Sequence, residues 1–189
     1  KVFKGGLAYS TDSFLNNLTI PVGLKNKIGV MINGSEISDS KTQIKCLKKL
    51  FKPKAKSIVT LVRIACHVHE FNDCLPASTW LKEQGYLVGI NIMQVADQSL
   101  DKITQLAQSA KNYPIDVLYF ADSMGSLNLS QLKKINYAFK KGWDKELGVH
   151  THDNIGQAVI NSVEAVKNGV TWVDSTVTGM GRGPGNAQT

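Results

Sequence analysis

Two histidines separated by one residue stand at the end of a short apolar stretch, and no other side chains of the sequence are better suited to chemistry. The stretch is residues 147–152, LGVHTH. Successive side chains of a β-strand point to opposite faces, so His150 and His152 must share one face. Two imidazoles side by side are half of a divalent-metal site, whereas the plainer alternative is a pair of packing histidines. Asp153 and Asn154 follow at once and add oxygen atoms that could bind the metal or hydrogen-bond to its histidine ligands, which favours the metal site.

A glycine-rich segment follows later in the chain, at residues 179–185. Four glycines in seven residues let backbone N–H groups approach an anion closely. We therefore expect a binding site for a carboxylate or phosphate there, with a tight turn as the alternative. Thr178, Arg182 and Asn186 lie in or beside this segment, and Arg182 is a candidate carboxylate clamp.

Length and composition indicate one folded domain over residues 1–189. The chain is 42% hydrophobic and has no run of 18 apolar residues, and its first residues lack a hydrophobic signal core. We therefore expect no membrane partner and a cytoplasmic location. The three cysteines, Cys46, Cys66 and Cys74, show no C-x-x-C spacing and are expected to be reduced thiols.

The net charge of +7 comes partly from seven lysines within residues 41–56. Several of them fall on the outer arc of a helical pattern without interleaved aromatic residues, which is typical of a solvated helix. We therefore expect no nucleic-acid partner. The positive charge suits anionic, carboxylate-bearing substrates equally well.

Short apolar runs alternate with helical patterns along the chain. The runs are residues 27–33, 57–67, 87–95, 117–122, 147–152 and 172–177, and the helical patterns are about 38–51, 72–84, 99–111, 128–141 and 155–168. Strands that are apolar on both faces and alternate with helices indicate an α/β fold with a parallel sheet. Polar residues at the carboxyl ends of successive strands favour a (β/α)8 TIM barrel over a doubly wound sheet.

The strand count predicts an incomplete barrel. Six βα units are two fewer than eight, and a complete barrel of this kind has about 250 residues. The first 26 residues fit a loop and a short helix that lead into the first visible strand. We expect a fragment that lacks two strands at the N-terminus and whatever region follows Thr189.

The strand ends supply the remaining candidate residues. His67 ends the second run, and Arg63 has the same strand parity, so Arg63 is either a substrate clamp or half of a structural ion pair. Gln94 is a candidate to hydrogen-bond substrate oxygen. Asp122 and Ser123 are candidates to contact substrate or to orient a ligating histidine. Asp174, within the last run, is expected to be a paired structural carboxylate.

Longer motifs resemble one enzyme superfamily. The segments HTHDNIGQA and DSTVTGMGRGPGNA, in register with VRIACH, NIMQ and ADSMG, closely resemble the HMG-CoA-lyase-like, or pyruvate-carboxyltransferase-like, metal-dependent TIM barrels. The resemblance covers residues 27–187, and the form of the last segment is most similar to the 4-hydroxy-2-oxovalerate aldolase branch. The family's first-strand motif, D-x-T-L-R-D-G, is not in this sequence.

The resemblance implies a metal-dependent lyase that acts on a small 2-oxo acid. His150 and His152 match two ligands of Mn2+ or Mg2+, and Asn186 matches a further ligand or an outer contact. His67 matches a histidine that lines the substrate pocket and, with Arg63, is assigned to catalysis. Gln94, Asp122, Ser123, Asn154, Thr178 and Arg182 are assigned to substrate binding.

Two other functions remain open from the sequence. One is an acetyl-CoA-dependent acyltransferase of the isopropylmalate or citramalate synthase type, which shares the metal residues. The other is a non-catalytic, truncated barrel that acts as a binding module. The resemblance also allows a homo-oligomer or a complex with an aldehyde dehydrogenase.

Overall fold

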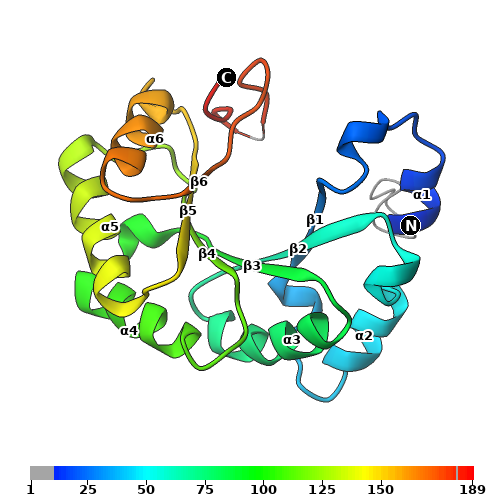
Figure 1. Cartoon of the computed structure of the whole chain (residues 1–189). Coiled ribbons are helices and arrows are strands. Elements are labelled where there is room, and N and C mark those ends of the chain that lie inside the picture. The colour runs from blue at the N-terminus through cyan, green and yellow to red at the C-terminus, as the bar shows by residue number, and fades with distance from the viewer. Residues whose placement is uncertain (1–10, 182) are drawn as a thin grey trace.

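Six parallel strands form one sheet whose spatial order follows the chain. The computed structural model describes residues 11–181 and 183–189. The strands are β1 (Ile28–Asn33), β2 (Val59–Cys66), β3 (Leu87–Ile92), β4 (Val117–Asp122), β5 (Glu146–Thr151) and β6 (Trp172–Val173). Figure 1 shows them as an arc that does not close, because β1 and β6 do not pair with each other in the described part of the chain. The predicted incomplete (β/α)8 barrel, with six of its strands, is confirmed.

Five helices cover the outer side of the arc (Figure 1). They are α2 (Gln43–Leu50), α3 (Phe71–Glu83), α4 (Leu100–Ala110), α5 (Leu129–Gly142) and α6 (Ala158–Lys167); α1 (Thr11–Asn16) precedes β1, and the short 3-10 helices are Val22–Leu24, Gly34–Glu36, Lys54–Lys56 and Val95–Asp97. Side-chain caps fix where some of them begin. The Ser99 hydroxyl accepts the Lys102 N–H at the start of α4, and Asn128 and Gln131 form a reciprocal capping box at the start of α5.

Helix α2 begins later than the lysine-rich pattern predicts. The carboxylate of Asp39 accepts the N–H of Lys41 and the hydroxyl of Thr42, which stabilises a turn where we expected the first helical turn. Lys41 therefore lies outside the helix.

The helix-facing side of the sheet is the apolar core. Alternate residues of the strands are fully buried there, among them Val62 and Ile64 of β2, Val88 and Ile90 of β3, and Phe120 of β4. The apolar residues of this face account for alternate positions of the apolar runs in the sequence. None of the described helices is long and apolar enough to span a membrane. All three cysteines are free thiols, as predicted.

The concave side of the sheet carries larger and more polar groups. The guanidinium of Arg63 lies 4.5 Å above the ring of Tyr119, and Trp172 meets that ring edge-on with centroids 6.4 Å apart. Tyr119 of β4 pairs with Gly148 of β5, and a Cβ atom at Gly148 would overlap its ring. The glycine therefore makes room for a layer of large side chains inside the arc.

The last strand is shorter than the predicted run 172–177. The segment at Ala187 lies beyond Val173 and takes the place that the strand would occupy. The N–H of Ala187 donates to Thr151 of β5, and the carbonyl of Ala187 accepts the N–H of Thr176. This insertion brings the end of the described chain next to the end of β5.

Replacement of Gly148 by Ala tests the packing of the concave layer. We expect Gly148→Ala to lower the free energy of unfolding by about 1–3 kcal/mol, because the buried ring and the strand backbone have little freedom to shift. The matched control is Gly29→Ala on the same face of β1, where the nearest atom to an added Cβ would be 3.4 Å away. Urea unfolding measures both, and equal stability of the two variants would contradict this view of the packing.

Candidate functional site

His150 and His152 lie together on the concave face at the carboxyl end of β5. Their ring centroids are 4.9 Å apart and their planes are nearly perpendicular, at 87°. Nδ1 of His150 lies 2.9 Å from a carboxylate oxygen of Asp174, and Nδ1 of His152 lies 2.9 Å from the carbonyl oxygen of Gly185. Both partners only accept hydrogen bonds, so each Nδ1 carries the proton, and the lone pair of a neutral ring lies on Nε2.

Asn186 joins the histidines through the inserted segment at the end of the chain. It forms an antiparallel bridge with His152, and its side-chain nitrogen donates to the carbonyl of Met180 at 3.1 Å. Its Oδ1 atom is buried and has no hydrogen-bond partner among the described residues. Gly181 leaves room for this amide, since a Cβ atom there would overlap it. A buried amide oxygen without a partner is well placed to bind a cation or a donor group.

These three side chains line one cavity of about 240 Å³ inside the arc. The other lining residues are Met31, Asn33, Ala65, Asn91, Met93, Ala121 and Ser123, which come from β1 to β4 and the residues that follow them. The cavity therefore opens at the carboxyl ends of the strands, where barrel enzymes carry their active sites.

Asn33 and Asn91 are site residues that the sequence reasoning missed. Asn91 is only 4% exposed, and its Oδ1 has no hydrogen-bond partner in the described part of the chain. The sequence did contain a signal for Asn91, which is a polar residue within an apolar run. It shares the strand face of Met93, and a buried amide in such a place needs a hydrogen-bond partner. Asn33 gave a weaker signal, as the last residue of β1.

Arg63 is paired with Asp174 and does not line the histidine cavity. One terminal nitrogen, Nη1, donates to Oδ1 at 2.9 Å, and the other, Nη2, lies 2.6 Å from Oδ2. Burial alone raises the pKa of Asp174, but hydrogen bonds from His150 and Arg63 and the Arg63 charge lower it by more, so it lies below the ordinary aspartate value. The predicted pairing of Asp174 is confirmed, and of the two alternatives for Arg63 the structure contains the ion pair.

Burial, and then the charge of Asp174, raise the pKa of the neighbouring Tyr119 to about 12. Its phenol is therefore neutral near pH 7. The concave face next to the histidines thus carries the partly buried Arg63–Asp174 ion pair and an uncharged tyrosine ring.

His67 and Gln94 come together in a separate pocket next to the histidine cavity. His67 follows the end of β2, and its Nδ1 lies 3.0 Å from Oε1 of Gln94. The pocket is about 410 Å³ and is also lined by Val68, His69, Met93, Asp97, Gln98 and Lys102. Gln94 has a left-handed backbone, with φ of 57°, and its N–H donates to the Ser123 hydroxyl at 3.0 Å. Ser123 lines the histidine cavity, so this bond joins the two spaces.

Asp122 has a different place from the one predicted. It is fully buried, on the core side of β4 with Phe120, and its carboxylate accepts the N–H groups of Ser126 and Leu127. Strand alternation turns it away from the cavity. Asp122 therefore holds the loop after β4, in place of the predicted contact with substrate or a ligating histidine.

Two more of the predicted substrate-binding residues, Asn154 and Thr178, lie outside the histidine cavity. Asn154 is exposed in the loop after β5 and packs near Gly125, and Thr178 is exposed at the start of the glycine-rich segment. Arg182 lies outside the described residues. The roles of these three stay predictions.

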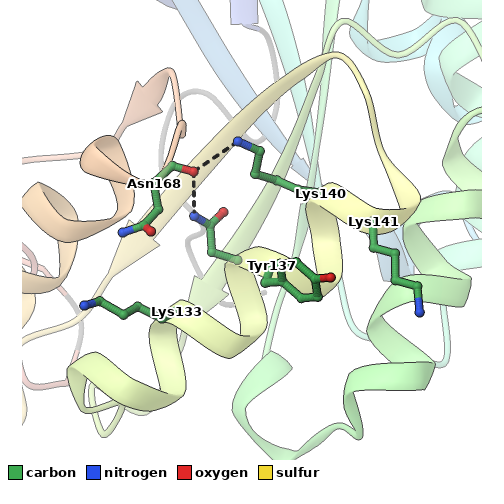
Figure 2. A pocket seen from close by; sticks show the side chains of 6 residues that line it. Lys133, Tyr137, Lys140, Lys141 and Asn168 are labelled. Carbon is green, nitrogen blue, oxygen red and sulfur yellow. Dashed lines mark hydrogen bonds between the residues drawn. The ribbon is translucent and has the colours of Figure 1, made fainter.

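A further pocket, of about 440 Å³, lies between α5 and α6 (Figure 2). Lys140 and Asn136 both donate to the carbonyl oxygen of Asn168, just after α6, and Lys133 pairs with Glu164 at 3.0 Å. These contacts hold the two helix ends together. The pocket lies in the outer helical layer and contains none of the predicted site residues.

The family model described as HMGL-like matches residues 23–189. The chain belongs to the HMGL-like family. It is 32% identical over 129 residues to a 4-hydroxy-2-oxovalerate aldolase of Bacillus thuringiensis, with 68% of this chain and 38% of that protein covered. It is 34% identical over 135 residues to the protein of the same name from Geobacillus thermodenitrificans, with 71% and 40% covered. The chain thus spans about two-fifths of the length of these relatives.

A solved structure supports the fold of this HMGL-like chain. The HMG-CoA lyase of Bacillus subtilis superposes with a TM-score of 0.74 at 14% identity, over 94% of this chain and 64% of that one. At this identity the likeness concerns the fold alone. It agrees with the barrel type that the order of strands indicates.

The role of Asp122 generates a prediction about stability. Asp122→Ala leaves the Leu127 N–H buried without an acceptor and frees the Ser126 N–H, so we expect a loss of about 2 kcal/mol in the free energy of unfolding. Ser123→Ala, one residue along, removes an acceptor from a more exposed N–H and is expected to lose less than about 1 kcal/mol. Urea denaturation compares the two, and an Asp122→Ala variant as stable as the unmodified chain would show that its carboxylate does not hold the loop.

Proposed function

We propose that this HMGL-like chain carries the metal-binding and substrate-binding part of a divalent-metal-dependent aldolase that acts on a small 2-oxo acid. The observation that carries the proposal is the convergence of His150, His152 and Asn186 on one cavity at the carboxyl ends of the strands. The names of the relatives in the 4-hydroxy-2-oxovalerate aldolase branch support this reaction class.

The donor atoms of the cavity fit a divalent cation. Two imidazole nitrogens can ligate a divalent cation. The buried Oδ1 of Asn186 adds an oxygen donor, the kind of atom that Mn2+ and Mg2+ prefer, and it lacks a partner among the described residues. The described residues contain no cluster of three or more histidine, cysteine or acidic side chains placed to hold a metal, so the amide is the third donor we assign. A bound Mn2+ or Mg2+ would supply Lewis-acid stabilisation of the enolate of a 2-oxo acid.

The size and polarity of the cavity favour a short substrate. Its volume of about 240 Å³ is below the roughly 300–1,000 Å³ of pockets for drug-sized ligands. A molecule of a few carbons fits this space better than a CoA thioester does. Asn33, Asn91 and Ser123 offer amide and hydroxyl groups to the oxygens of such a molecule, and Oδ1 of Asn91 can accept from a substrate hydroxyl.

The cavity itself offers few groups to move a proton. Among the described residues its lining contains no lysine, arginine or carboxylate, and its two imidazoles are assigned to the metal. We assign the transfer of a proton to His67, which is next to the cavity and is joined to it through Gln94 and Ser123. This assignment keeps His67 in its predicted catalytic role, while Arg63 is engaged by Asp174.

Removal of both cavity histidines tests the metal site. We expect calorimetric titration to show Mn2+ binding to the unmodified chain and a large loss of Mn2+ affinity in the His150→Ala/His152→Ala variant. Removing a residue that only hydrogen-bonds to a metal ligand lowers metal affinity by roughly 10–100-fold, and removing the two ligands is expected to lower it by more. His67→Ala/His69→Ala is the matched control, since it removes an equally spaced pair from the neighbouring pocket. Equal uptake of Mn2+ by the unmodified chain and the His150/His152 variant would contradict the proposal.

The reaction is tested by product release. With 4-hydroxy-2-oxovalerate and Mn2+, we expect the chain to release pyruvate and the His150→Ala/His152→Ala variant to release none. Thiol release from acetyl-CoA and a 2-oxo acid, without pyruvate release, would point to the acyltransferase class and overturn the aldolase assignment.

A further inference from the structure

We propose that Asp174 is a positioning residue for His150 and that Arg63 anchors it. In this proposal the carboxylate of Asp174 fixes the ring proton on Nδ1 and presents Nε2 to the cavity. The link to metal binding rests on the proposed function, whereas the control of the ring proton does not. From the sequence, Asp122 and Ser123 are the candidates to orient a ligating histidine, and Asp174 is expected only to be a paired structural carboxylate.

The contacts of the Asp174 carboxylate define the arrangement. Its Oδ2 atom lies 2.9 Å from Nδ1 of His150 and 2.6 Å from Nη2 of Arg63, while Oδ1 accepts from Nη1 of Arg63 at 2.9 Å. Both oxygens are engaged by the planar fork of the guanidinium, which fixes the carboxylate in two directions. The direction of the His150 hydrogen bond follows from this, because the ring meets an oxygen that has no freedom to rotate.

Arg63 is itself held by Asp174 and by the ring of Tyr119. Its two terminal nitrogens are on Asp174, its face lies 4.5 Å above Tyr119, and its side chain is 13% exposed. Turning it toward a substrate would leave the Asp174 charge buried without a cation, which is costly. Arg63 therefore acts indirectly, by holding Asp174, which in turn holds His150, and does not itself contact the reacting atoms.

The carboxylate also supplies charge that the donor atoms lack. Two neutral imidazoles and an amide oxygen carry no negative charge, whereas hard divalent cations prefer carboxylate ligands. A carboxylate behind a ligating imidazole makes its other nitrogen more basic and fixes the ring orientation. Nδ1 of His152 has a backbone carbonyl, that of Gly185, in the corresponding position, whereas Nδ1 of His150 has a carboxylate that a substitution can remove.

The ring proton of His150 can be observed directly in metal-free protein. Two-dimensional 15N–1H NMR of labelled histidine at pH 7.5 distinguishes a proton on Nδ1 from one on Nε2. We expect the unmodified chain to hold His150 with its proton on Nδ1. In Asp174→Asn we expect a population with the proton on Nε2 that is at least fivefold larger, together with Mn2+ affinity lower by about 10–100-fold in calorimetry.

Asp116→Asn is the matched control for loss of a paired carboxylate. Asp116 makes an ion pair with Lys82 at 2.6 Å and precedes β4, at the amino end of the strands and away from the histidines. We expect it to leave both the His150 ring proton and the Mn2+ affinity unchanged. A change in Asp116→Asn equal to that in Asp174→Asn would overturn the proposal, because the effect would then follow from net charge alone.

Arg63→Lys decides the matter if Asp174→Asn does not fold. Lysine keeps the charge but loses the fork, so we expect an intermediate shift of the ring proton and a loss of Mn2+ affinity of about 3–10-fold. The proposal is overturned if Asp174→Asn folds, keeps the His150 proton on Nδ1 and keeps its Mn2+ affinity within twofold. If Asp174→Asn does not fold, the same result in a folded Arg63→Lys overturns it. If the unmodified chain binds no Mn2+, the metal function fails, and the NMR result alone supports or overturns the positioning role.

Discussion

The contacts of the partly buried Asp174 carboxylate are the interaction on which the concave side of this barrel depends. It joins Arg63 of β2 to His150 of β5, so it spans the inside of the arc between strands that do not touch. Removing one partner of a fully buried pair costs about 3–5 kcal/mol, because the other charge is left without compensation. The cost is smaller here, because both side chains are partly exposed. The position of Arg63 and the orientation of a candidate metal ligand are thus held by the same group.

The histidine cavity exists because the chain end is inserted at the edge of β5. Ala187 bonds to both Thr151 and Thr176, and this brings Asn186 beside His152 and the Gly185 carbonyl within reach of its ring. The glycines of this segment allow the close approach of backbone and amide. The fold therefore builds the site from two parts, a strand that supplies imidazoles and a loop that orients one of them and adds an oxygen.

Much of the fold and part of the site could be predicted from local sequence. Six apolar runs gave the six strands, since buried parallel strands need apolar residues on both faces. The parity of a strand placed His150 and His152 on one face, and the same rule, applied to Asp122 and Phe120, would have turned Asp122 toward the core. The partners of Asp174 could not be predicted in this way, because Arg63 lies 111 residues earlier. His67 follows the end of β2, where strand parity no longer applies.

The most direct test of the account is electron spin-echo spectroscopy of Mn2+ added to the chain. Modulation from nitrogen atoms bonded to the metal reports imidazole ligands without any need for turnover. The account predicts modulation from two imidazole nitrogens, which disappears in His150→Ala/His152→Ala and persists in His67→Ala/His69→Ala. A bound Mn2+ without nitrogen modulation, or modulation that survives the loss of His150 and His152, would contradict it.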